Sequence, residues 1–95
     1  MIYNDFLATI SDSAPTAGIE GVLESLWYEK KGDWDKAHRI VQDIPSSIGS
    51  AVHAYLHRKE GDIGNARYWY GRAGRDEYSG SLDDEWDSLA KEIAE

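Results

Sequence analysis

The sequence predicts an all-α protein with a single domain, made of two tandem helix–turn–helix units and a C-terminal capping helix. Three observations support this fold class: an internal repeat with a period of 29 residues, apolar side chains three and four positions apart, and glycine–aspartate pairs between the helical stretches. A length of 95 residues suits one domain. We expect an N-terminal segment at 1–16, the first unit at 17–45, the second unit at 46–75 and the capping helix at 81–95.

The repeat becomes visible when residues 19–45 are aligned with residues 48–74. Apolar positions coincide along most of this alignment, as two copies of one helical hairpin would require. Four identities also coincide: Lys30 with Lys59, Gly32 with Gly61, Asp33 with Asp62 and Ala37 with Ala66. The two stretches therefore predict the same helix–turn–helix unit twice.

The glycine–aspartate pairs mark the turn inside each unit. Gly32 and Gly61 end the first helix, because glycine adopts the left-handed backbone conformation without a steric penalty. Asp33 and Asp62 follow as N-caps, with carboxylates that accept hydrogen bonds from the free N–H groups of the next helix. Each unit should thus contain two helices joined by a short turn.

The two ends of the chain differ from the units. Residues 2–10 form a short apolar segment, for which the sequence leaves helix and loop open. Ser81 is typical of an N-cap, and the helix that follows should cover the open face of the second unit while its acidic residues face water. One apolar stripe predicts this helix: Leu82, Trp86, Leu89, Ala90 and Ile93. We expect five helices, or six if the N-terminal segment folds, and no sheet.

The composition excludes several classes of function and partner. The net charge is −8, and residues 76–95 hold eight acidic residues against Lys91 alone, so we expect no nucleic-acid partner. The absence of cysteine excludes disulfides and thiolate catalysis. No stretch approaches the roughly 20 apolar residues of a membrane span, and the first ten residues do not resemble a signal peptide. We therefore expect a cytoplasmic protein without a membrane partner.

Two motifs resemble tetratricopeptide repeats: Tyr28-x3-Gly32-Asp33-x3-Ala37 and His57-x3-Gly61-Asp62-x3-Ala66-x3-Tyr70-x2-Ala73. The stretch from Ala66 through Trp69 and Tyr70 to Ala73 is similar to the Sel1-like branch of that superfamily, and the wider block at 34–70 is similar to small bacterial proteins of unknown function. The resemblance covers residues 19–74. It implies a fragment of a right-handed α-α superhelix that binds proteins or peptides on a concave face, and it implies no chemistry.

The main candidate site is one side of the helix expected before Gly61. His53 and His57 are four residues apart and share this side, which the periodicity places away from the apolar stripe together with Glu60. Three interpretations are open: a solvated polar face, a groove for a partner or ligand, and a metal site. One unit earlier, the same positions are held by Glu24 and Tyr28.

The register of the repeat superfamily predicts another orientation, in which His53 and His57 turn inward and satisfy each other or backbone groups. His38 lies near the apolar stripe of its own helix, so we expect a buried, hydrogen-bonded histidine rather than a ligand. Tyr68 points away from the core stripe and is a candidate contact residue, because exposed tyrosines are enriched in binding hot spots.

No residue set forms a catalytic signature, since Ala54 stands where a zincin would need glutamate between His53 and His57. We therefore predict no enzyme, no cofactor and no assigned metal. The function predicted first is a non-catalytic protein-interaction or scaffold module whose partner is a protein or peptide, with a homodimer as one form. The alternative is a small-ligand or metal-binding protein that uses the His53 and His57 face.

Overall fold

The computed structural model describes residues 1–94, and this part of the chain contains six α-helices and no strand. In chain order the elements are α1 (Tyr3–Ala8), the 3₁₀ turn η1 (Thr9–Ser11), α2 (Val22–Lys30), α3 (Trp34–Gln42), α4 (Ser47–Glu60), α5 (Ile63–Ala73) and α6 (Leu82–Ile93). The predicted all-α class is confirmed, and the question left open for residues 2–10 is answered by a short helix. None of the described helices is long and apolar enough to cross a membrane.

The two glycine–aspartate turns share one backbone geometry. Gly32 and Gly61 have φ values of 92° and 89°. Asp33 follows with φ −100° and ψ 74°, and Asp62 with φ −90° and ψ 78°. Both carboxylates accept a backbone N–H from the next helix, at 3.1 and 3.2 Å, and Ser81 caps α6 in the same way at 3.0 Å. The three predicted N-caps are therefore confirmed.

The first helices of the two units differ in length. The apolar pattern places Ile19 on the first helix, but Gly21 has φ 62°, so α2 begins only at Val22. Ile19 is nevertheless buried, in the loop before the helix. Helix α4 has fourteen residues against nine in α2, with Ser46 as its N-cap. The units match in their turns but not in their first helices.

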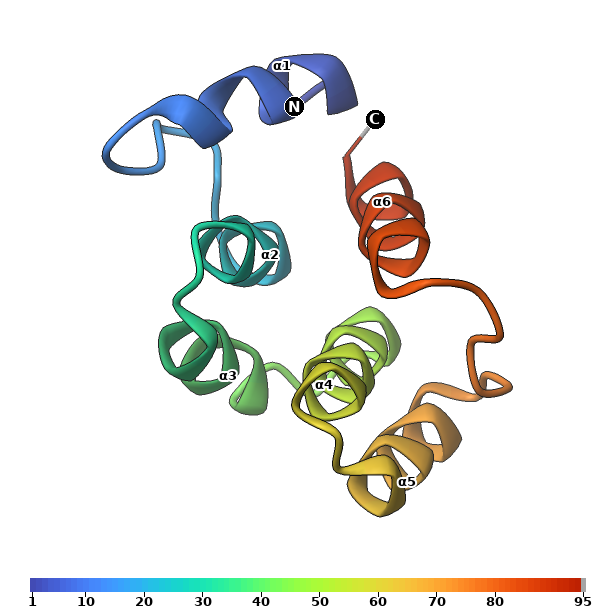
Figure 1. The fold of residues 1–95 in the computed structure, drawn as a ribbon. Coiled ribbons are helices and arrows are strands. Elements are labelled where there is room, and N and C mark those ends of the chain that lie inside the picture. Colours follow the sequence, from blue (N-terminus) through green and yellow to red (C-terminus); the bar gives the residue numbers. More distant parts are fainter. Residues whose placement is uncertain (95) are drawn as a thin grey trace.

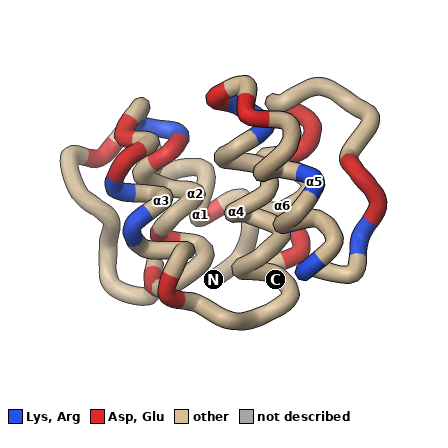
Figure 2. Tube along the Cα trace, turned by 90° about the horizontal axis from the view of Figure 1, so that it is seen from below, with Lys and Arg blue, Asp and Glu red and all other residues tan. Residues whose placement is uncertain are grey.

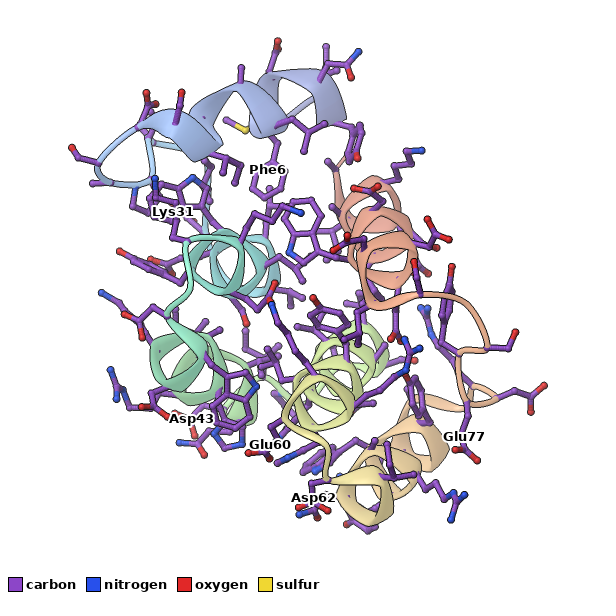
Figure 3. All side chains as sticks on the ribbon, viewed as in Figure 1. Phe6, Lys31, Asp43, Glu60, Asp62 and Glu77 are labelled. Atoms are coloured by element: carbon purple, nitrogen blue, oxygen red, sulfur yellow. The ribbon has the colours of Figure 1, made fainter. Side chains whose placement is uncertain are left out.

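Helices α2, α4 and α6 converge on the hydrophobic core, and α1 runs crosswise to α2 and α6 along one side of them (Figure 1). Phe6 points from α1 into the space between α2 and α6 and stacks on Trp86, with ring centroids 5.8 Å apart (Figure 3). The Trp86 indole N–H donates to the Leu26 carbonyl at 3.1 Å, and the Trp27 indole N–H donates to Thr9 Oγ1 at 3.2 Å. Both ends of the chain are thus anchored on α2.

Helix α6 packs against α2 as well as α4, so it covers both units rather than the second unit alone. Its predicted apolar stripe is confirmed, because Trp86, Leu89 and Ala90 are buried. The expectation that all its acidic residues face water is wrong for Glu85, which is only 2% exposed. This carboxylate is turned toward α4 and α5, where Arg58 and Tyr70 bind it.

Helices α3 and α5 lie on the opposite side of the molecule from α1 and α6, with α4 between them (Figure 1). The side of α2 and α4 that faces away from α3 and α5 is therefore occupied by the core. The remaining exposed side of this central region is formed by α3, the end of α4 and α5. That side carries the candidate site.

Candidate functional site

His53 and His57 point into the protein. They are 4% and 8% exposed, so the polar face that the periodicity predicts away from the packing stripe is wrong. The inward orientation given by the alternative register agrees with their burial. The physical reason is the position of α4, which contacts α2, α3, α5 and α6, so that every residue from Gly49 to His57 is buried. Apolar periodicity separates a buried helix face from a solvated one, and a helix that is covered on all sides has no solvated face.

A third histidine from another helix completes a cluster. His38 of α3 is half-buried, and its Nε2 lies 3.0 Å from Nε2 of His53, which makes a hydrogen bond between the two imidazoles. The ring centroid of His57 is 5.2 Å from the ring centroid of His38 and 4.9 Å from that of His53. One donor atom from each histidine can be chosen so that all three lie within 4.8 Å of one another. We call these three residues the histidine cluster.

Two tryptophans hold the rings of the histidine cluster in place. Trp34 stacks on His38 with ring centroids 5.0 Å apart, and its indole N–H donates to the Leu56 carbonyl at 2.8 Å. Trp69 of α5 stacks on His53 with centroids 3.8 Å apart and planes only 15° from parallel. One tryptophan thus stacks on His38 and another on His53, which restricts the orientations of these two imidazoles.

Glu60 joins the cluster through His57. It lies at the end of α4, in the region between α3 and α5 (Figure 3). Its Oε2 is 2.7 Å from Nδ1 of His57, which places a hydrogen bond on that nitrogen. When Nδ1 carries the proton, the neutral ring keeps an unprotonated Nε2. Glu60 therefore selects which nitrogen of His57 is free.

Burial favours the uncharged form of two of the imidazoles. The pKa of His53 is lowered to about 4, mainly because burial disfavours the charged ring, and further by repulsion from His38 and His57. Burial is also the main cause that lowers the pKa of His38 below its usual value, although Glu60 and Asp35 act in the opposite direction. At neutral pH His53 therefore presents a neutral imidazole.

Glu24 and Tyr28 do not belong to this cluster. Both lie on α2 and are half-buried, and the described hydrogen bonds and ion pairs connect neither side chain to a histidine. The Tyr28 ring instead lies under Lys36 Nζ at 4.2 Å and edge-on to Trp27 at 5.1 Å. The positions on α2 are equivalent to those on α4 in sequence but not in surroundings. Helix α3 brings His38 to α4, whereas the segment before α2 contacts Trp27, whose indole N–H donates to Thr9.

Tyr68 lies on the exposed side of α5, as predicted, with 54% of its surface accessible. Its hydroxyl accepts a hydrogen bond from Arg72 Nη1 at 2.9 Å, and its ring lies edge-on to Trp69 at 5.2 Å. The Arg72 guanidinium lies 5.9 Å from the Tyr68 ring and 5.6 Å from the Trp69 ring. We call these three residues the aromatic–arginine patch.

Trp69 connects the patch with the histidine cluster. The sequence assigns Trp69 to the core stripe, whereas the structure leaves it half-exposed between His53 and the patch. Sequence reasoning also missed that His38, fifteen residues before His53, joins the other histidines. The only available signal was its position near the apolar stripe of α3, which indicates contact with α4 but does not specify the partner.

A buried ionic network lies on the other side of α5. Arg58 Nη1 donates to Glu85 Oε1 at 2.8 Å, the Tyr70 hydroxyl donates to Oε2, and Arg58 Nη2 donates to the Gly80 carbonyl. A small pocket borders Tyr70, Glu85 and the loop after α5. Because both oxygens of Glu85 already have partners, this network stabilises the loop and leaves no free carboxylate oxygen for a ligand.

The fold and these contacts together describe an all-α protein with a buried histidine cluster beside an exposed aromatic–arginine patch. No family model, curated protein or solved structure matches the chain. The resemblance to tetratricopeptide repeats stays a prediction.

Proposed function

We propose that this chain is a non-catalytic protein-interaction module that binds its partner through the aromatic–arginine patch of α5. The matching turns of the two helical hairpins support a tetratricopeptide-like arrangement. The core fills the side of α2 and α4 on which that superfamily would bind a peptide, so we place the partner on the opposite side. The observation that carries the proposal is the environment of Arg72.

Arg72 differs from the neighbouring arginines. Arg67 pairs with Glu77 at 3.1 Å and Arg75 pairs with Glu92 at 2.6 Å. Arg72 contacts two aromatic rings and a tyrosine hydroxyl, and no carboxylate within the described residues pairs with it. Figure 2 shows acidic and basic positions interspersed along the chain, on both sides of the view. In a chain of net charge −8, an exposed arginine without an acidic partner is available to an external one.

The chemistry of the patch indicates what the partner presents. Trp, Tyr and Arg are the residues most enriched in binding hot spots. A guanidinium offers a planar set of N–H donors that matches a carboxylate, and the two rings offer apolar area beside it. The partner should therefore be a protein segment that carries an acidic side chain next to an apolar one.

Affinity capture with matched variants tests this function. The bait is the full chain in three forms: wild type, Tyr68→Ala with Arg72→Ala, and Arg67→Ala as a control that removes a charge from the same helix. A protein captured by wild type and control is then titrated into each form by calorimetry. We expect at least tenfold weaker binding for the double variant, which corresponds to about 1.4 kcal/mol.

Two outcomes contradict the proposal. Equal affinity of the wild type and the double variant would remove α5 as the binding surface, provided that circular dichroism shows both folded. Sedimentation at several concentrations tests whether the chain forms a homodimer. If the wild type associates and the double variant does not, the partner is a second copy of the chain. Capture of no protein, together with a monomer at all concentrations, would contradict the interaction function itself.

A further inference from the structure

We propose that His38, His53 and His57 form a binding site for a divalent transition-metal ion of the zinc class, with one imidazole nitrogen from each residue as ligand. None of the three ligands belongs to the aromatic–arginine patch, so zinc binding can be tested without a partner at α5. The two sites share only Trp69, which stacks on His53. Imidazole is a suitable ligand for zinc, copper and nickel, and three histidines form a known type of zinc site.

The spacing of the donors is close to what a metal requires. Zinc binds imidazole nitrogen at 2.0–2.1 Å, so two ligands in a tetrahedral site are about 3.3 Å apart. The Nε2 atoms of His38 and His53 are 3.0 Å apart and need to separate by only a few tenths of an ångström. One donor nitrogen from each of the three histidines can be chosen so that all three lie within 4.8 Å of one another, so the rings have to rotate to bring the third nitrogen to coordination distance.

Glu60 supplies the support that metal-binding histidines usually have. A ligating histidine commonly donates its other N–H to a carboxylate, which fixes the tautomer and the direction of the ring. The contact of 2.7 Å between His57 Nδ1 and Glu60 Oε2 has this form and leaves Nε2 for the metal. Stacking of Trp34 on His38 and of Trp69 on His53 fixes the other two rings.

The protonation state also suits a metal. An imidazole must be neutral to bind, and protons compete with the metal at sites where histidine is easily charged. Burial lowers the pKa of His53 to about 4 and lowers that of His38 as well. Both shifts favour the neutral imidazole that a metal requires.

A neighbouring set of groups is a weaker alternative. His57, Glu60 and Asp62 also have donor atoms within 4.8 Å of one another, but the two carboxylates are exposed. Asp62 is already engaged, since it caps α5 and accepts a second hydrogen bond from the Asn65 side chain at 2.7 Å. The three imidazoles have fewer competing contacts. Their metal would connect α3 in the first hairpin with α4 in the second, and solvent would complete its coordination.

The direct test uses the full, tag-free chain after removal of metals with a chelator. Zinc is titrated in by calorimetry, and the imidazole nitrogens of wild type are followed by long-range ¹H–¹⁵N spectra. The sequence contains only these three histidines, so every imidazole signal reports on the site. We expect one zinc per chain and simultaneous changes at all three imidazoles. Cobalt should give the visible absorption of a tetrahedral site.

Variants separate this site from binding to acidic groups. His38→Ala removes a half-exposed ligand, and we expect at least a hundredfold loss of zinc affinity. Glu60→Gln should weaken binding by about tenfold, because it changes the support of His57 and not a ligand. Asp83→Asn with Asp84→Asn, which changes two exposed carboxylates of α6, should leave zinc binding unchanged.

Several results would overturn the proposal. One is a wild-type chain that gives no heat with zinc and no imidazole shift. Another is a spectrum in which fewer than three imidazoles respond. A third is an affinity that His38→Ala preserves and the α6 variant abolishes. Because the wild-type spectra need no substitution, a variant that fails to fold still leaves the proposal decided.

Discussion

At the scale of single residues, Glu85 shows how one buried carboxylate organises its surroundings. It is 2% exposed and binds Arg58 and the Tyr70 hydroxyl, and Arg58 also holds the Gly80 carbonyl of the loop before α6. The pKa of Tyr70 is raised, mainly by burial and further by Glu85, so its hydroxyl remains a donor. Removing one member of such a network leaves the others buried without a partner, which is costly.

Substitution of Tyr70 by phenylalanine tests this network. Tyr70→Phe keeps the ring but removes the donor to Glu85, so we expect a loss of about 1.5–3 kcal/mol in the free energy of unfolding, as for hydrogen bonds to charged groups. Urea denaturation followed by circular dichroism measures it. Tyr68→Phe is the control, since its hydroxyl is exposed, and should change stability by less than about 0.5 kcal/mol. Equal effects of the two substitutions would mean that Glu85 does not depend on Tyr70.

At the scale of elements, α4 and α5 pack closely because small residues meet between them. Ala54 and Ala66 are 0% and 1% exposed and form a small core with Tyr70. This contact also sets the distance between α4 and Trp69, and hence the stacking of Trp69 on His53. Alanine recurs at this position of both units, as Ala37 and Ala66, and its small side chain favours a close approach of the two helices. No pattern in the sequence predicts the aromatic contact that depends on this approach.

A larger side chain at Ala66 should force these helices apart. Ala66→Leu is expected to lower the free energy of unfolding by about 1–3 kcal/mol through overpacking. Thermal or urea unfolding gives the value. Gly71→Ala on the same helix is the control, because a Cβ there meets nothing within 4 Å, and removing a glycine from a helix should raise stability by about 0.5–1 kcal/mol. A neutral Ala66→Leu would mean that α4 and α5 can separate without cost.

At the scale of the whole molecule, the two ends of the chain close the core. Trp86 is 1% exposed, stacks on Phe6 of α1 and donates to the Leu26 carbonyl of α2. One side chain therefore connects α1, α2 and α6. Helical repeats need covered ends because each unit leaves an apolar side that a neighbour must bury.

Truncation of Trp86 should threaten the entire fold. Trp86→Ala is expected to remove about 3–5 kcal/mol, a large share of the 5–15 kcal/mol that stabilises a typical domain. The midpoint of urea unfolding checks this expectation. Trp69→Ala, at a half-exposed position, should cost clearly less. Similar losses for both tryptophans would contradict the central place of Trp86 in the core.

The sequence by itself determined the local structure. The positions of Gly32, Gly61, Asp33, Asp62 and Ser81 predicted the turns and caps, because capping depends on side chains within three residues of the helix end. The apolar stripe of α6 was equally readable, since one side of that helix faces the core. The sequence also predicted correctly that His53, His57 and Glu60 lie together, because the three residues share one helix.

Only the tertiary structure decided which way the histidines point and what they meet. Periodicity distinguishes a buried side from an exposed one, and α4 is enclosed by four other helices. The contact between His38 and His53 joins two helices, and the distance between their nitrogens follows from the packing of α3 on α4. Glu24 and Tyr28 occupy the repeat positions that correspond to His53 and His57, but the packing around α2 leaves them outside the histidine cluster. Local rules place a side chain on its helix, but the neighbouring helices determine its partners.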